Sequence, residues 1–174
     1  MKYLLLDRDG TINVDKDCLS DPEDIEFCSG TVDGLKRMQR GGIKFFILTN
    51  QSWIAKGKLT IAQYKQCEER LLKMLADEGI QIAAVRYCPH RKEDLCECRK
   101  PKIGMWESLR KEFPELNEDE CAMVGDMDRD VLLGKNIGCM TFRIDSGKFP
   151  VGEKGDYLVK NLNEVADILL GHAV

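Results

Sequence analysis

The chain has 174 residues, of which 43% are hydrophobic and 32% charged, a composition typical of one globular domain with a substantial core. Its formal net charge is −4, so no overall positive field favours a nucleic acid or a membrane surface as partner. The apolar start turns acidic too soon for a signal peptide, and no apolar run is long enough to span a bilayer. We therefore expect a cytoplasmic protein with one domain over residues 1–174.

Short apolar runs alternate along the chain with stretches whose apolar residues recur at helical spacing. In chain order we expect strand 3–6, helix 32–40, strand 43–48, helix 61–78, strand 82–87, helix 104–113, strand 121–124, helix 128–136, strands 140–144 and 157–159, and helix 162–170. This alternation predicts an α/β fold, a Rossmann-like three-layer sandwich with a mainly parallel sheet. Because segments 13–29 and 91–95 are short, we expect no cap domain over the sheet edge.

Two carboxylates stand where the first strand ends. Asp7 and Asp9 follow the apolar run 3–6 directly and precede Gly10. Ligands of open α/β sheets bind at the carboxyl ends of the strands. Two carboxylates this close repel each other unless a cation lies between them, and Mg²⁺ suits such a pair because it leaves room for phosphate oxygens. The alternative is an acidic turn that caps a helix.

Three further strands end in reactive groups. Thr49, Asn50, Gln51 and Ser52 follow the second strand, Arg99 and Lys100 follow the loop after the third, and Asp126 follows the fourth, with Asp130 one helical turn later. In a parallel sheet these ends lie at one edge, so the side chains converge. A carboxylate nucleophile, a second acid, hydroxyl and amide donors, a lysine and metal-binding carboxylates are the groups that phosphoryl transfer needs.

Taken together, these motifs resemble the four motifs of the haloacid dehalogenase superfamily. The resemblance implies that Asp7 attacks phosphorus to form an aspartyl-phosphate, and that Asp9 protonates the leaving alcohol and then deprotonates water. Thr49 and Lys100 would stabilise the phosphoryl oxygens. Asp7, the carbonyl of Asp9 and Asp126 would hold Mg²⁺, and Asp130 would be either a further ligand or a residue behind the ligands. The enzyme would be a phosphoric monoester hydrolase.

One of the two histidines lies within a cysteine cluster. Cys88, His90, Cys96 and Cys98 bracket a short polar loop, and three thiolates with one imidazole are a favoured tetrahedral Zn²⁺ set. The alternatives are a disulfide and chance clustering. Four protein ligands leave no open position, so we expect a structural zinc loop over residues 88–98 that stiffens the segment carrying Arg99 and Lys100. The other cysteines (18, 28, 67, 121 and 139) are scattered, and we expect them to be reduced.

The zinc loop resembles that of the capless branch that contains heptose bisphosphate phosphatases and histidinol-phosphate phosphatases. The stretches 10–15 and 49–58 are similar to the heptose enzymes, which implies removal of the 7-phosphate of D-glycero-D-manno-heptose 1,7-bisphosphate in carbohydrate metabolism. The short loop 91–95 instead matches the histidinol phosphatases. The chain departs from the heptose pattern at Trp53, where a Gly is usual, and at Met127, where a Lys is usual; Arg129 is a candidate to replace that cation.

This resemblance also implies where the sugar would lie. Arg99 would contact the substrate, as its planar fork suits a second phosphate or a pair of sugar hydroxyls. The remaining substrate-binding candidates are Asp15, Lys16, Asp17, Cys18, Asn50, Gln51 and Ser52. We expect a monomer that binds a small phosphorylated substrate. A different class, a zinc-stabilised binding module without catalysis, remains as an alternative, although the catalytic positions named above are all intact.

Overall fold

The computed structural model describes residues 1–171. Its strands and helices are β1 (Tyr3–Leu6), α1 (Thr31–Arg40), β2 (Lys44–Asn50), α2 (Ile61–Asp77), β3 (Ile82–Cys88), α3 (Gly104–Glu112), β4 (Cys121–Gly125), α4 (Asp128–Ile137), β5 (Met140–Ile144), β6 (Tyr157–Val159) and α5 (Leu162–Leu170). Each element expected from the sequence is present. Short 3₁₀ turns at Pro22–Asp24, Lys92–Asp94 and Glu118–Glu120 lie in the connections.

The strands form one sheet in the order β3-β2-β1-β4-β5-β6. All neighbouring pairs are parallel, which confirms the α/β prediction. The chain builds outward from β1 through β2 to β3, then crosses back to β4 on the other side of β1. Ligands of open α/β sheets bind where the strand order reverses in this way. The end of β1 is therefore flanked by the ends of β2 and β4, and residues from all three strands meet there.

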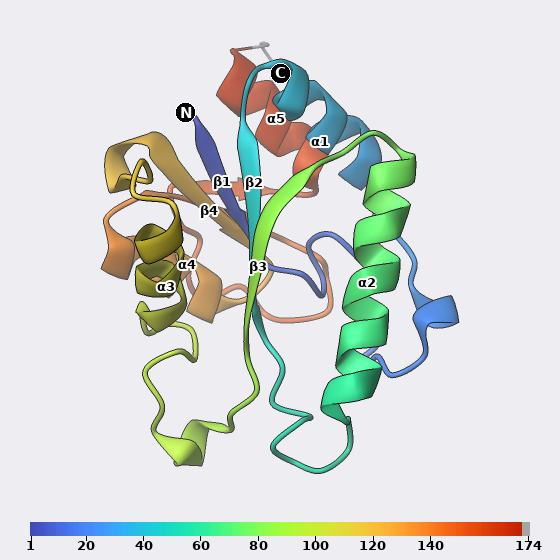
Figure 1. The fold of residues 1–174 in the computed structure, drawn as a ribbon. Coiled ribbons are helices and arrows are strands. Elements are labelled where there is room, and N and C mark those ends of the chain that lie inside the picture. Colours follow the sequence, from blue (N-terminus) through green and yellow to red (C-terminus); the bar gives the residue numbers. More distant parts are fainter. Residues whose placement is uncertain (172–174) are drawn as a thin grey trace.

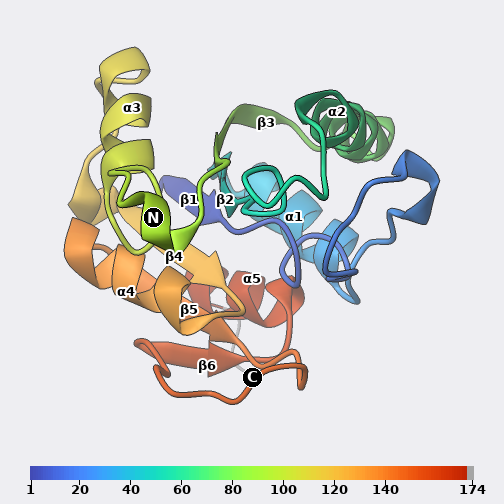
Figure 2. The same ribbon diagram turned by 90° about the horizontal axis from the view of Figure 1, so that it is seen from below.

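Helices cover both faces of the sheet, which gives the expected three layers (Figures 1 and 2). Helices α1, α2 and α5 pack on one face, where Leu4 and Leu6 contribute to the core. Helices α3 and α4 pack on the other face, with Tyr3 and Leu5. Strand β1 is buried along its whole length, because side chains that alternate between the two faces meet a helical layer on each side.

Local sequence signals fix the ends of the helices that frame the site. Thr60 caps α2 through a reciprocal capping box with Gln63, so its side chain accepts from the Gln63 N–H. Gly138 ends α4 with φ at 91°, a left-handed conformation that glycine adopts without strain. The N-terminal turn of α4 begins at Asp128, directly after β4 ends at Gly125, which places it at the carboxyl edge of the sheet.

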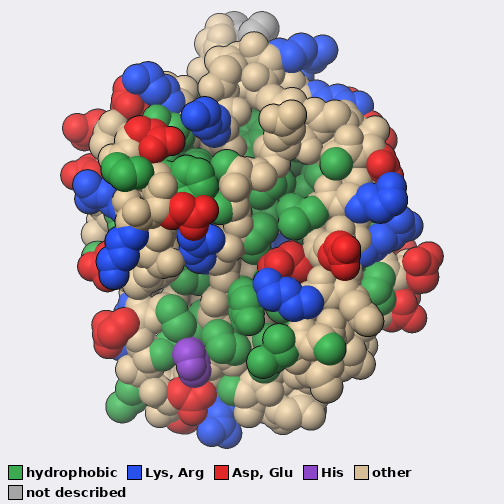
Figure 3. Space-filling model, in the orientation of Figure 1, with side chains coloured by type: hydrophobic (Ala, Val, Ile, Leu, Met, Phe, Trp, Pro, Cys, Tyr) green, Lys and Arg blue, Asp and Glu red, His purple; other side chains and the backbone are tan. Residues whose placement is uncertain are grey.

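Strand β3 lies at one edge of the sheet, and its residues are mostly half-buried. Figure 3 shows apolar side chains in the hollow between α2 and α3, where this strand runs, and basic and acidic side chains scattered together over the rest of this face. No second folded unit lies over the carboxyl edge within residues 1–171, in agreement with the expected lack of a cap. None of the described helices is long and apolar enough to cross a membrane.

Candidate active site

The end of β1 holds a carboxylate in a buried ion-pair network. Asp7 is only 3% exposed, and its backbone N–H donates to the carbonyl of Val124 at 2.9 Å, which ties it to β4. The Lys100 ammonium lies 2.8 Å from Asp7 Oδ1 and 2.7 Å from Asp130 Oδ1. It also donates to the Leu48 carbonyl at 2.7 Å. Lys100 therefore bridges two carboxylates while its third proton is satisfied by β2.

Asp7, Asp126 and Asp130 offer carboxylate oxygens that all lie within 4.8 Å of one another. Burial, reinforced by Asp130, raises the pKa of Asp7 to about 6. Burial, reinforced by Asp7 and Asp130, raises the pKa of Asp126 to about 8. Asp126 Oδ2 is buried and accepts no hydrogen bond from the described residues. Acidic groups that resist ionisation and a buried oxygen without a partner are what a hard divalent cation would relieve, so this donor set fits Mg²⁺.

The Asp9 carboxylate accepts hydrogen bonds from a different set of side chains. Arg8 donates to both of its carboxylate oxygens, at 3.1 and 3.0 Å. Asn13 adds a bond at 3.0 Å and Gln51 one at 2.9 Å. Burial alone would raise the pKa of Asp9, but Arg8, Asn13 and Gln51 outweigh it and hold this pKa below its ordinary value. The two aspartates of the motif therefore sit in opposite electrostatic environments.

The end of β2 and the first residue after it hold the active-site side chains in place. Gln51 donates to Thr49 Oγ1 at 2.8 Å as well as to Asp9, so it links the hydroxyl to the second carboxylate. Asn50 accepts from the Lys100 N–H at 3.0 Å and donates to the Lys100 carbonyl at 3.2 Å. This paired contact fixes the backbone from which the Lys100 side chain enters the site.

A cavity of about 230 Å³ opens beside these groups. Of the predicted substrate-binding residues, it is lined by Asp15, Asp17, Asn50, Gln51, Ser52 and Arg99. Two do not reach it. Lys16 pairs with Glu26 at 3.3 Å, and the Cys18 thiol lies 3.6 Å from the Lys58 carbonyl. The structure thus gathers most of the predicted set but not Lys16 and Cys18.

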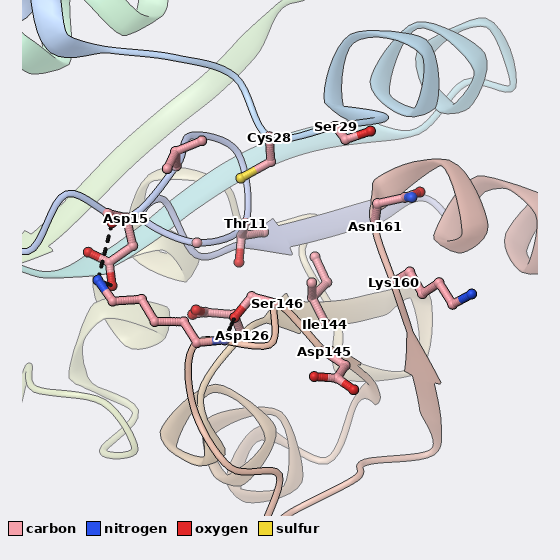
Figure 4. A pocket seen from close by; sticks show the side chains of 13 residues that line it. Thr11, Asp15, Cys28, Ser29, Asp126, Ile144, Asp145, Ser146, Lys160 and Asn161 are labelled. Carbon is pink, nitrogen blue, oxygen red and sulfur yellow. Dashed lines mark hydrogen bonds and ion pairs between the residues drawn. The ribbon is translucent and has the colours of Figure 1, made fainter.

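A larger cavity, of about 300 Å³, also has Asp126 in its lining (Figure 4). Thr11 and Cys28 line it, and Asp15 is common to both cavities. Lys148 bonds to Asp15 at 3.0 Å and to Asp17 at 3.0 Å, which joins the loop after β5 to the loop after β1. Of the two cavities, only the smaller brings together Asp9, Arg99 and the loop after β2, so it holds most of the residues predicted to bind substrate.

The four predicted zinc ligands come together. His90 Nδ1 lies 3.3 Å from Cys98 Sγ and 3.6 Å from Cys88 Sγ, and Cys96 Sγ lies 3.6 Å from both other sulfurs. These separations are too long for a disulfide and close to the edges of a tetrahedron around a zinc-sized ion. All eight cysteines are free thiols. The four side chains are placed so that they could hold a metal ion, and the cluster is not a disulfide.

The cluster is joined to the active-site loops by backbone contacts. The Gln51 N–H donates to the Cys88 carbonyl at 2.7 Å, and Ala55 N–H to the Pro89 carbonyl at 3.1 Å. Arg99 donates to the His90 carbonyl at 3.1 Å. The cysteine–histidine loop therefore supports both the loop after β2 and the segment that carries Arg99.

Several residues around the site lay outside the sequence prediction. Arg8 is 3% exposed and stacks over Tyr64 at 5.4 Å while it holds Asp9, but its position between the two aspartates gave no sign of this contact. Phe149, from the long connection between β5 and β6, lines the cavity of about 230 Å³. That connection has no motif, so only its position in space identifies it.

The amino-acid sequence is similar to those of known phosphatases. A sequence profile of the polynucleotide kinase 3 phosphatase family matches residues 2–139. The D-glycero-beta-D-manno-heptose-1,7-bisphosphate 7-phosphatase of Pasteurella multocida is 33% identical over 98% of this chain and 97% of its own length. The Escherichia coli K12 enzyme of the same name is 33% identical, with 95% of this chain and 90% of the relative covered.

A solved phosphatase structure is similar to this chain over its whole length. The D,D-heptose 1,7-bisphosphate phosphatase of B. bronchiseptica, complexed with magnesium and phosphate, superimposes with a TM-score of 0.85 and 28% identity, covering 99% of this chain and 100% of that one. The fold and site thus define a phosphoric monoester hydrolase. The chain belongs to the haloacid dehalogenase superfamily of phosphatases, in agreement with the resemblance of its four motifs.

The raised pKa values of Asp7, about 6, and Asp126, about 8, predict how magnesium stabilises the fold at different pH. A carboxyl group whose pKa is raised by folding stabilises the fold while protonated, so this contribution is lost as the pH rises through those values. Mg²⁺ removes the repulsion that then appears, and at low pH it must compete with protons. We expect the Mg²⁺-induced rise in Tm to be small near about pH 5 and larger near about pH 8. Equal rises at both pH values, by thermal denaturation, would contradict this.

Proposed function

We propose that the chain hydrolyses the 7-phosphate of D-glycero-D-manno-heptose 1,7-bisphosphate with Mg²⁺, through an aspartyl-phosphate on Asp7. The observation that carries the reaction is the buried Asp7–Lys100 pair, 2.8 Å apart. A carboxylate oxygen of Asp7 lies within 4.8 Å of one of Asp126, and Asp126 lines a cavity of about 230 Å³ together with Asp9. The names of relatives that match nearly the whole chain support the choice of substrate.

Asp7 is the nucleophile in this proposal. Lys100 holds Oδ1 and leaves Oδ2 to attack the phosphorus atom, while the bond to the sugar oxygen breaks on the opposite side. As charge spreads over the equatorial oxygens, the Thr49 hydroxyl and the Lys100 ammonium stabilise it. Water then attacks the aspartyl-phosphate and releases inorganic phosphate.

Asp9 would serve both steps as acid and base. It gives a proton to the departing sugar oxygen and takes one from the attacking water. Its low pKa in the free protein suits the second task. A bound phosphate brings negative charge close to Asp9 and raises its pKa, which favours the protonated form needed in the first step. Arg8 and Gln51 keep the carboxylate oriented throughout.

Asp7, the backbone carbonyl of Asp9 and Asp126 would hold Mg²⁺, which neutralises phosphate charge when bound. Asp130 accepts from the Met127 N–H at 3.0 Å and pairs with Lys100, so it is better placed behind the ligands than among them. Cys88, His90, Cys96 and Cys98 would hold a structural Zn²⁺ and keep Arg99 and Lys100 in place.

We also propose that residues 1–174 act as one domain, as a monomer in the cytoplasm that binds neither nucleic acid nor membrane. The two helical layers share one sheet, and eight free thiols suit a reducing compartment. The short loop 91–95, whose compact spacing resembles that of the histidinol phosphatases, favours histidinol phosphate as a second substrate candidate.

Replacing Cys96 by Ser tests the zinc loop. The variant should lose most of the bound zinc, which we expect at about one ion per chain in the parent protein, because three ligands hold the ion far less tightly than four. Elemental analysis of the purified protein measures this, and a lower Tm should accompany the loss. Cys18→Ser, outside the cluster, is the matched control. Parent protein without zinc, or a Cys96→Ser variant that retains it, would contradict the assignment.

Steady-state kinetics test the substrate. We expect kcat/KM for the heptose 1,7-bisphosphate to exceed that for the heptose 7-phosphate by about tenfold or more, since the second phosphate reaches Arg99. Histidinol phosphate should be poorer still. Asp7→Asn should lower kcat by about 10⁴-fold or more, because the nucleophile is lost. A preference for histidinol phosphate would overturn the substrate, and turnover unchanged by Asp7→Asn would overturn the reaction. No turnover of any phosphate ester by the parent protein would favour the binding module.

A further inference from the structure

Most of the cations around the active site already have partners. Lys100 is shared between two carboxylates. Arg8 is held in two bonds to Asp9. One nitrogen of the Arg99 guanidinium donates a hydrogen bond to the His90 carbonyl. A cation that is committed to the protein in this way orients its neighbours and offers little to a substrate.

Arg129 differs from these three. It is the second residue of α4, and its side chain lines the substrate cavity. Its Nε atom is buried without a hydrogen-bond partner, and the guanidinium forms no ion pair with any residue in the range 1–171. A buried donor left without a partner is costly, so a group that supplies the missing acceptor gains that energy on binding.

The two aspartates adjacent to Arg129 in the sequence do not supply the missing acceptor. Asp128 pairs with Arg143 at 3.0 Å and also accepts backbone N–H groups from the loop after β5. Asp130 pairs with Lys100 at 2.7 Å. Arg129 therefore keeps its charge free although an aspartate stands on each side of it.

The strand order places Arg129 on the β4 side of the cavity. Arg129 follows β4, the neighbour of β1, whereas Arg99 and Lys56 belong to the β2–β3 side of the same cavity. Arg129 also acts on both acids of the centre, since its charge opposes the rise in pKa of Asp7 and of Asp126. The cavity thus has one free cation, Arg129, on its β4 side and two cationic side chains, Arg99 and Lys56, on its β2–β3 side.

We infer that Arg129 is a substrate-binding residue whose guanidinium receives oxygens of the phosphoryl group that is transferred, while Arg99 and Lys56 meet the far end of the substrate. The inference rests on the proposed function only in taking a phosphate monoester as substrate, whatever the alcohol. Two parallel N–H bonds from a planar fork match two phosphate oxygens. Arg129 would also supply the cation that the sequence lacks at Met127.

Binding of inorganic phosphate in the presence of Mg²⁺, measured by isothermal titration calorimetry, tests this. Arg129→Met should weaken phosphate binding by about 10- to 100-fold, the usual effect of losing a hydrogen bond to a charged group. Arg129→Lys should recover part of the affinity, as it restores the charge without the fork. Arg40→Met, at the far end of α1, is the matched control and should leave phosphate binding unchanged. If the Met variant does not fold, Arg129→Gln gives the same comparison.

A kinetic comparison separates the two flanks. Arg129→Met should lower kcat/KM by the same factor for a sugar bisphosphate and its monophosphate, because both carry the transferred group. Lys56→Met should lower it for the bisphosphate alone. Unchanged phosphate binding in the Arg129 variants, or a loss confined to the bisphosphate, would overturn the inference. If heptose bisphosphate proves not to be the substrate, the phosphate titration still decides the role of Arg129.

Discussion

The Lys100 ammonium, enclosed between Asp7 and Asp130, is the interaction on which the rest of the site depends. Its side chain and that of Asp130 are 0% exposed, so neither charge is screened by water. A buried charge is tolerated only with partners, and removal of Lys100 would leave two carboxylates uncompensated in a dry interior. The Asn50 contacts to the Lys100 backbone and the cysteine–histidine loop ahead of it are the means by which the fold delivers this ammonium.

Charge balance then explains the need for a metal. The centre contains the carboxylates of Asp7, Asp9, Asp126 and Asp130, against the cations of Lys100, Arg8 and Arg129. The acids are in excess, and the raised pKa values of Asp7 and Asp126 show where the excess is concentrated. Asp9 is relieved by Arg8, which lets two aspartates one residue apart differ in their protonation and hence in their roles.

Much of this site could be predicted because it depends on a short list of regular features. Apolar runs and helical spacing fix the strands and helices, and a parallel sheet brings the strand ends together, so Asp7, Thr49 and Asp126 had to meet. The pairing of Cys88-x-His90 with Cys96-x-Cys98 likewise required only one short loop. The contacts that the sequence does not predict are those that depend on the direction in which a side chain points. Nothing in the spacing shows that Asn50 turns back to hold a backbone.

The connection between β5 and β6 illustrates the same limit. Lys148 crosses to Asp15 and Asp17, which lie more than a hundred residues earlier in the chain. Phe149 from the same connection lines the cavity beside Asp9 and Arg99. Such long-range contacts leave no local pattern. The sequence could name Arg129 as a candidate cation, but its freedom from partners is visible only once Asp128 and Asp130 are seen to be engaged elsewhere.

The most direct test of the account is to trap the phosphorylated enzyme. In an Asp9→Asn variant the base that activates water is lost, so rapid acid quenching after mixing with Mg²⁺ and an aryl phosphate, a substrate that needs little help from a general acid, should catch the intermediate. Mass spectrometry of the proteolysed protein should find one added phosphoryl group on the peptide that carries Asp7. No phosphopeptide within the first turnover, or a phosphoryl group on another residue, would contradict the assignment of Asp7 as the nucleophile.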